Sequence, residues 1–222
     1  MIKCLSVISN DNRKKINDKL NMKPISLVVI DPQVGFCHPQ GSLGLAYGEE
    51  ELKSIIRMLP SLAKAMAQSE RVYIVQSEYA YGQFSKSPDD ALAKLCVPGK
   101  NNDCQLIEQL AAEGCDGLYV KGQPSAASNS VLLEQLKMDM AQGAWSIVLV
   151  GFLLEHCVKA SAIDLRRALP AANITVCTDL CGSRQQKYAN GEVDAALTLL
   201  QEEGILCQRW QDIGSYTCLQ GD

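Results

Sequence analysis

The sequence has few of the residues and patterns that mark several common classes of protein. It contains two histidines and no Cys-x-x-Cys pair, so a zinc site is a weak alternative. Its formal net charge is −4 and no basic block occurs, so we do not expect nucleic acid as a partner. No run of apolar residues reaches membrane-spanning length, so we do not expect a membrane either.

The first 23 residues also lack the apolar segment of a secretory signal. They are polar, and we interpret residues 1–23 as an N-terminal arm. The chain has ten cysteines, but they are scattered through expected strands and helices of a mid-sized chain with a hydrophobic fraction of 47%. Reduced thiols in the cytoplasm fit this pattern better than a disulfide framework does.

Apolar runs typical of buried strands alternate with segments that have helical spacing. The expected strands are residues 25–30, 71–76, 118–120, 147–150, 174–177 and 205–207. The expected helices are residues 49–69, 103–113, 128–140, 157–167 and 191–203, the first of them kinked or split at Pro60. This alternation predicts one α/β domain over residues 24–222, a three-layer α/β/α sandwich with a mostly parallel sheet of about six strands.

Three ionisable side chains follow three of these strands: Asp31, Lys121 and Cys157. Carboxyl ends of parallel strands meet at one edge of a sheet, so these positions could lie together. A thiol in the first turn of a helix could ionise, a carboxylate could take its proton, and an ammonium could stabilise the charge. Each residue also has a plainer interpretation: Asp31 as a turn residue, Lys121 as a solvated lysine, and Cys157 as a small buried side chain.

The residues around these three positions carry a family resemblance. Residues 31–43 (DPQVGFCHPQGSL), 121–132 (KGQPSAASNSVL) and 151–158 (GFLLEHCV) resemble, in order, the aspartate, lysine and cysteine motifs of the isochorismatase-like cysteine hydrolases. Asp179 with Ser183 is similar to the closing segment of that family. The resemblance implies the isochorismatase-like hydrolase fold, shared with nicotinamidases and related amidohydrolases.

The resemblance also assigns roles to residues. It implies that Asp31 is the base, Lys121 its electrostatic partner and Cys157 the nucleophile. It implies that the backbone N–H groups of Leu153 and Cys157 form the oxyanion hole, with a cis peptide bond at Phe152–Leu153. The implied reaction is hydrolysis of a C–N bond of amide type in a small molecule, through a thioester intermediate.

Four further residues are candidates for substrate binding. Gln33 and Phe36 follow the base, and Glu78 and Tyr79 lie at the end of the second strand. Phe36 could equally belong to the core, and Glu78 could be a solvated carboxylate. We rank His156 below Asp31 as a base, because neighbouring residues of a helix point about 100° apart.

The resemblance implies no cofactor and no metal for this chain. The nicotinamidases of the family bind a metal through an Asp-x-His motif after the second strand, and residues 76–81 of this chain contain no histidine. By resemblance we expect a homo-oligomer, a dimer or tetramer.

Three other hypotheses stay open at this point. The chain could be a family member that acts on a non-amide substrate. It could be a binding or regulatory protein with a compromised pocket, since Ala127 stands where the family usually has an aromatic residue. A thiol-based redox sensor would need a resolving cysteine near Cys157.

Overall fold

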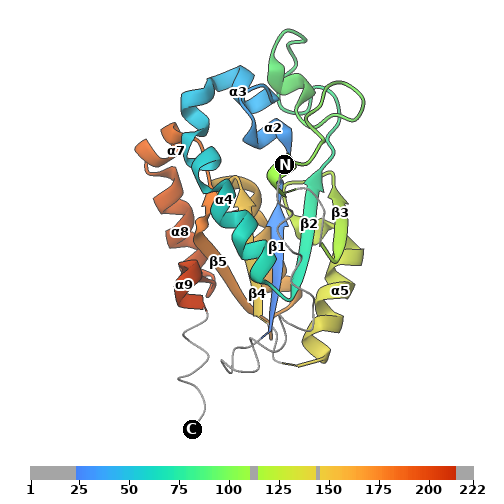
Figure 1. The fold of residues 1–222 in the computed structure, drawn as a ribbon, viewed down its shortest axis with the longest axis vertical. Coiled ribbons are helices and arrows are strands. Elements are labelled where there is room, and N and C mark those ends of the chain that lie inside the picture. Colours follow the sequence, from blue (N-terminus) through green and yellow to red (C-terminus); the bar gives the residue numbers. More distant parts are fainter. Residues whose placement is uncertain (1–23, 111–114, 144–145, 214–222) are drawn as a thin grey trace, which may run out of the picture.

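A single parallel sheet forms the centre of the protein. The computed structural model describes residues 24–110, 115–143 and 146–213; the expected N-terminal arm lies outside them. Six strands pair in parallel in the order β3-β2-β1-β4-β5-β6 (Figure 1). They are β1 (Ile25–Ile30), β2 (Arg71–Ser77), β3 (Gly117–Lys121), β4 (Ser146–Phe152), β5 (Asn173–Gly182) and β6 (Leu206–Gln208). The predicted α/β fold with a parallel sheet is therefore confirmed.

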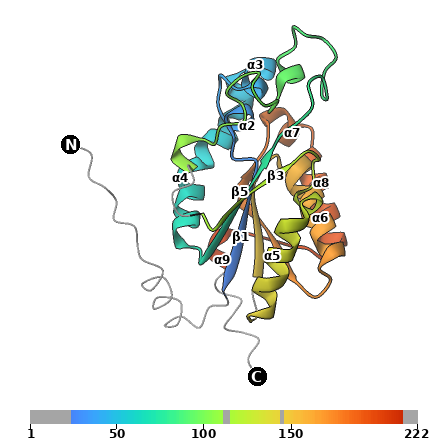
Figure 2. The same ribbon diagram turned by 90° about the vertical axis from the view of Figure 1, so that its right-hand side faces the viewer.

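Helices cover both faces of this sheet, as Figure 2 shows. One face carries α2 (Val34–Cys37), α3 (Ser42–Tyr47), α4 (Lys53–Gln68) and α9 (Trp210–Ile213). The other carries α5 (Ser130–Ala141), α6 (Lys159–Ala168) and α8 (Glu192–Glu202). A short helix, α7 (Gln185–Ala189), follows β5. Short 3-10 helices lie at η1 (Glu49–Leu52), η2 (Ala91–Lys94), η3 (Glu108–Leu110) and η4 (Ala126–Ser128), and a π-helical turn, η5, at Leu154–Val158.

The central strand β1 shows why the sheet needs both layers. Leu27 and Val29 pack into the core on the α4 face, whereas Val28 and Ile30 pack into the core on the α6 face, and all four are fully buried. Alternate side chains of a strand point to opposite faces, so a continuous apolar run requires cover on both. The next residue, Asp31, is therefore placed by the most enclosed strand of the sheet.

The helix α4 does not divide at Pro60, contrary to one of the two predicted outcomes. A single α-helix runs through this proline, after the short η1 turn. Proline inside a helix costs about 3 kcal/mol, but a buried apolar side chain contributes about 1.5–3 kcal/mol. The helix buries four such side chains against the sheet, Ile55, Met58, Leu59 and Leu62, together with the smaller Ala65. Packing of this face therefore outweighs the defect.

The helix predicted over residues 103–113 is wrong for its first five residues. Turns and a bridge occupy this segment before the 3-10 helix η3 begins at Glu108, and residues 111–114 lie outside the described part. The carboxylate of Asp103 accepts hydrogen bonds from the N–H groups of Ser42 and Cys96. Backbone carbonyls of the segment accept from Val34 and Gly35. Tertiary hydrogen bonds thus take the place of the helical ones.

Strand β4 continues through Gly151 to Phe152, two residues beyond the end of the predicted strand 147–150. Gly151 has φ of +113° and pairs with Ile30 of β1. A Cβ atom at Gly151 would lie 2.1 Å from the carbonyl oxygen of Ile30. Only glycine can therefore hold β4 this close to β1 at the point where the strand leads into the Cys157 turn.

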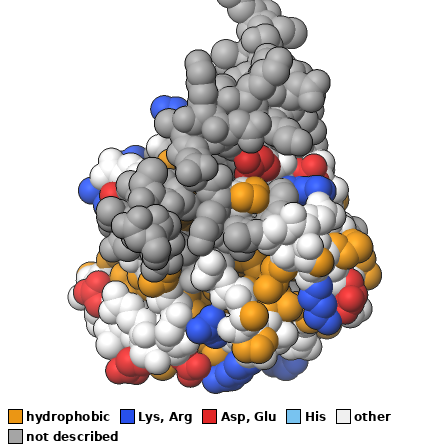
Figure 3. Space-filling model, turned by 90° about the horizontal axis from the view of Figure 1, so that it is seen from below, with side chains coloured by type: hydrophobic (Ala, Val, Ile, Leu, Met, Phe, Trp, Pro, Cys, Tyr) orange, Lys and Arg blue, Asp and Glu red, His pale blue; other side chains and the backbone are white. Residues whose placement is uncertain are grey.

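The opposite end of the molecule, at the amino ends of the strands, is seen in Figure 3. Lys, Arg, Asp and Glu side chains are scattered over its visible described part and do not gather into a patch of one sign. No helix of the described residues is long and apolar enough to cross a membrane.

Candidate active site

The carboxyl edge of the sheet brings the three predicted catalytic residues together. Asp31 follows β1, Lys121 is the last residue of β3, and Cys157 lies in the π-helical turn after β4. The Nζ atom of Lys121 lies 3.0 Å from Oδ2 of Asp31, and both side chains are completely buried. Cys157 is only 1% exposed.

Strand β2 lies between β1 and β3 and supplies a residue that the sequence did not indicate. The hydroxyl of Ser77 donates to Oδ1 of Asp31 at 2.8 Å and accepts from Nζ of Lys121 at 2.7 Å. Ser77 pairs in register with Lys121. A small polar residue at the end of the strand between the two charged ones was the available signal.

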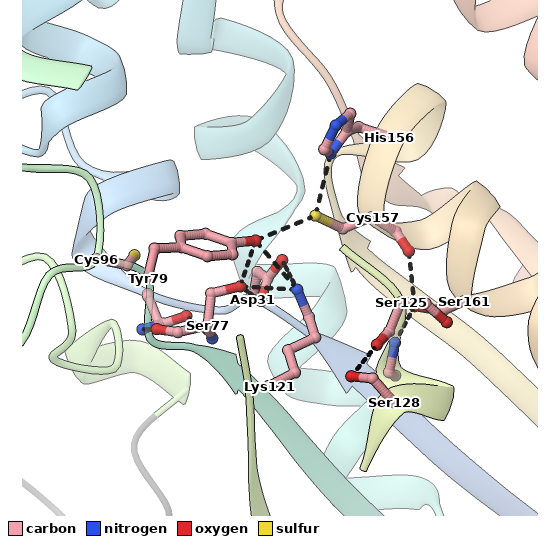
Figure 4. A network of polar contacts seen from close by, with 12 residues as sticks. Asp31, Ser77, Tyr79, Cys96, Lys121, Ser125, Ser128, His156, Cys157 and Ser161 are labelled. Atoms are coloured by element: carbon pink, nitrogen blue, oxygen red, sulfur yellow. Dashed lines mark hydrogen bonds and ion pairs between the residues drawn. The ribbon is translucent and has the colours of Figure 1, made fainter. Parts of the chain in front are cut away.

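Tyr79 links this charged pair to the thiol. Its hydroxyl lies 2.8 Å from the Ser77 hydroxyl, 3.4 Å from Nζ of Lys121 and 3.8 Å from Sγ of Cys157. Figure 4 shows the Tyr79 hydroxyl between Cys157 and the group formed by Asp31, Ser77 and Lys121. The thiol and the ion pair therefore belong to one hydrogen-bonded network.

The buried lysine carries a positive charge. Burial is the largest single influence and lowers the pKa of Lys121, but the charges of Asp31 and Cys157 and the hydrogen bonds to both residues together outweigh it, so the net pKa is raised. A buried ammonium is stable only beside a partner that compensates its lost hydration. The Lys121–Asp31 pair is therefore a fixed dipole next to the sulfur.

The thiol itself is neutral at rest. Burial raises the pKa of Cys157, the charge of Asp31 raises it further, and the charge of Lys121 offsets only part of this. A helix N-terminus was expected to favour the thiolate, but the completely enclosed position has the larger effect. The Cys157 proton must therefore leave as the substrate binds or reacts.

His156 lies closer to the thiol than sequence reasoning indicated. Its Nδ1 atom is 3.3 Å from Sγ of Cys157 (Figure 4). The two residues lie in a π-helical turn instead of a regular α-helix, so the α-helical angle between neighbours does not apply. Burial lowers the pKa of His156, so its ring is neutral near pH 7.

The turn before Cys157 has the backbone geometry that the family resemblance implied. The peptide bond Phe152–Leu153 is cis. The carbonyl of Leu153 accepts from the N–H groups of His156 and Val158. The N–H of Leu153 has no hydrogen-bond acceptor among the residues that the structure describes.

A cavity of about 240 Å³ opens beside the thiol. Of the predicted substrate-binding residues, Phe36 and Tyr79 line it, together with Leu153, His156 and Cys157. Sequence analysis did not indicate most of the other lining residues, which come from distant segments: Leu43, Tyr47, Phe84, Leu92, Leu95, Glu155, Arg184, Lys187 and Glu192.

The other two predicted substrate-binding residues, Gln33 and Glu78, do not line the cavity. The amide of Gln33 accepts from the N–H of Ser77 at 2.7 Å and donates to its carbonyl at 3.0 Å. Gln33 is completely buried and does not line the cavity, so it positions Ser77. Glu78 also lies outside the lining, and its carboxylate accepts from the amide of Gln76.

The end of β2 does not fit the metal motif of the nicotinamidases. Glu78 is the one carboxylate of residues 76–81, and it is hydrogen-bonded to Gln76. Across residues 24–110, 115–143 and 146–213, no group of three or more His, Cys, Asp or Glu side chains could hold a metal ion.

Comparisons with known proteins agree with this fold. The family model described as the isochorismatase domain matches residues 26–210. PnC1 from L. infantum in complex with nicotinate superimposes with a TM-score of 0.65 at 18% identity, over 86% of this chain and 94% of that one. An isochorismatase family protein from Desulfovibrio vulgaris gives 0.64 at 18% identity, over 88% and 99%. An Acinetobacter baumanii nicotinamidase gives 0.63 at 18% identity, over 86% and 98%. No curated protein matches the chain.

Proposed function

Because this chain belongs to the isochorismatase family of hydrolases, we propose that it cleaves a C–N bond of amide type in a small molecule. The observation that supports this most is the buried Asp31–Lys121 ion pair, joined through Ser77 and Tyr79 to the Cys157 thiol beside a small cavity. We assign Cys157 as the nucleophile, Asp31 as the base and Lys121 as their electrostatic partner.

The first step activates the thiol. Asp31 takes the proton of Cys157, and the sulfur attacks the carbonyl carbon of the amide while the C=O electron pair moves to the oxygen. The N–H groups of Leu153 and Cys157 stabilise that oxyanion. The free N–H of Leu153 at the cavity wall supports this assignment.

The next steps release the two products. The tetrahedral intermediate collapses, the C–N bond breaks, and protonated Asp31 donates its proton to the departing amine, which leaves a thioester on Cys157. A water molecule then attacks the thioester carbonyl, and Asp31 takes a proton from it. Collapse breaks the C–S bond, releases the carboxylic acid and returns the proton to the Cys157 thiolate.

Lys121 keeps its charge throughout these steps. It lies 3.0 Å from Asp31 and is close enough to Cys157 for each to shift the pKa of the other. When the Cys157 proton moves to Asp31, negative charge moves from oxygen to sulfur. The ammonium can follow that charge within the same network and lower the cost of the transfer.

The proposal also covers the binding partner, the cellular location and the oligomeric state. We propose a small molecule as substrate, since the Cys157 thiol lies beside a cavity of about 240 Å³. The cytoplasmic location, the homo-oligomeric state and the lack of a nucleic-acid partner stay predictions. Light scattering of the purified protein measures the oligomeric state directly.

Ammonia release from a panel of small primary amides and ureas tests the proposal, with native protein and Cys157→Ala compared in chelator-treated buffer. We expect release by the native protein alone. Equal release by both proteins would refute the role of Cys157. Silence from both, with Cys157 still open to alkylation, would favour a non-amide substrate or a binding role on the same fold.

A further inference from the structure

The side chain of Arg184 combines burial, position and an unused hydrogen-bond donor. Arg184 follows β5 and lines the cavity that contains the Cys157 thiol. Its side chain is nine-tenths buried, with 10% of its surface exposed. Its Nη1 atom is the one buried side-chain nitrogen or oxygen without a hydrogen-bond partner in the part of the chain that the structure describes.

The guanidinium plane is held in place by neighbours that leave this donor free. It lies over the ring of Tyr47, with Cζ 3.8 Å from the ring centroid. The carboxylate of Glu51 is 3.7 Å from Nη1, which is an ion pair but too long for a hydrogen bond. The same Glu51 oxygen accepts from the N–H of Gln186 at 3.0 Å. Arg184 is therefore fixed in direction but only partly compensated.

The other charges around the cavity have direct partners. Lys187 lies 2.6 Å from Glu192, so these two neutralise each other. The carboxylate of Glu155 accepts a hydrogen bond from the hydroxyl of Ser183. Arg184 therefore differs from them, because it lines the cavity and its enclosed Nη1 atom has no hydrogen-bond partner among the described residues. Buried cations and buried donors without partners are costly, and proteins keep them where a ligand completes the set.

We infer that Arg184 binds a carboxylate of the substrate, so that the substrate is a small amide which also carries a carboxylate group. This inference rests on the proposed amide hydrolysis and adds the substrate class to it. A carboxylate accepts from the planar guanidinium fork in a charge-assisted hydrogen bond. A cavity of about 240 Å³ has room for a short monoamide of a dicarboxylic acid.

The test compares substrates that differ in one group. Monoamides of the two-, three- and four-carbon dicarboxylic acids are each paired with their own diamide, and kcat/KM is measured by ammonia release. For at least one length we expect the native protein to prefer the monoamide acid. In Arg184→Gln that preference should fall by about ten- to a hundredfold, the size of a lost charge-assisted hydrogen bond.

Arg167→Gln is the matched control. Arg167 lies on the surface with 65% of its side chain exposed, so its loss changes the net charge by the same amount and should leave the preference unchanged. Arg184→Lys is the second variant, because lysine keeps the charge but loses the planar fork; we expect an intermediate preference. If Arg184→Gln does not fold, Arg184→Lys alone tests the inference.

A binding measurement separates this inference from the proposed reaction. The Cys157→Ala protein, with and without Arg184→Gln, is titrated with each monoamide acid and each diamide, and the shift in melting temperature is recorded. Stabilisation by the acid that disappears with Arg184→Gln supports the inference even if native protein hydrolyses no amide. A native preference for the diamide, or an unchanged preference in Arg184→Gln and Arg184→Lys, would overturn it while leaving amide hydrolysis intact.

Discussion

Replacing Lys121 by methionine should destabilise the fold far more than loss of an ordinary lysine. Both partners of the Lys121–Asp31 pair are completely buried, and methionine leaves the Asp31 carboxylate without its counter-charge. Removal of one member of a buried ion pair typically costs about 3–5 kcal/mol. A domain of this kind is stable by about 5–15 kcal/mol in total. Lys121→Met should therefore lose a large part of its free energy of unfolding.

A double-mutant cycle isolates the pair from the rest of the network. Asp31→Asn, Lys121→Met and the double variant are unfolded in urea at pH 7, and the free energies of unfolding are compared with the native value. The double variant has no unpaired charge, so it should be more stable than the sum of the single effects predicts, by about 2 kcal/mol. Cys157 stays intact in all four proteins.

Lys137→Met is the control, because Lys137 lies 2.7 Å from Glu134 in a surface pair whose side chains are 51% and 67% exposed. Such pairs contribute less than about 1 kcal/mol. If Lys121→Met costs no more than Lys137→Met, the reasoning from burial is refuted. Additive single effects at Asp31 and Lys121 would show that the two charges do not stabilise each other.

Three other predictions concern pH, the base and the backbone. Burial raises the pKa of several thiols above their unfolded value of about 8.5. The unfolded chain therefore releases these protons first, so the free energy of unfolding should fall as pH rises above that value. Urea titrations at pH 7, 8.5 and 9.5 measure this dependence, and a free energy of unfolding that does not change with pH would contradict it. The thiols concerned include Cys37, Cys96, Cys157, Cys177 and Cys181. Asp31→Asn should lower kcat by about 10²–10⁴-fold and His156→Gln by much less, and the reverse order would make His156 the base. Gly151→Ala should lower the free energy of unfolding by about 3 kcal/mol or more, through backbone strain and the clash with Ile30. Gly99→Ala is the control, because Gly99 has φ of +72° but open space around its Cβ position. It should lower the free energy of unfolding by about 1–2 kcal/mol, measured by thermal unfolding.

The main features of the fold and site could be predicted from sequence because they depend on local patterns. Apolar runs indicated all six strands, and the carboxyl-edge rule predicted that Asp31, Lys121 and Cys157 could lie together. The family motifs added the cis peptide bond at Phe152–Leu153, which no composition or periodicity would reveal.

The features that sequence did not indicate depend on contacts between distant segments. Ser77 becomes important only because β2 lies between β1 and β3, and Arg184 only because β5 ends beside Tyr47 of α3. The segment that begins at Asp103 has helical spacing, but its backbone carbonyls accept hydrogen bonds from Val34 and Gly35 of α2. The contact between His156 and Cys157 was not expected, because an α-helical angle was assumed where the chain makes a π-helical turn.

The sheet order has a consequence for the dynamics of the site. Asp31 and Cys157 follow the central strands β1 and β4, but Lys121 ends β3, which is an edge strand and pairs with β2 alone within the described part of the chain. Edge strands open locally at a lower free energy than central ones. Brief fraying of β3 would withdraw the ammonium and leave the carboxylate and thiol in place. The hydrogen bonds that Lys121 makes to Asp31 and Ser77 fasten the end of this edge strand to the centre of the sheet, so they should prolong the lifetime of the complete proposed catalytic set.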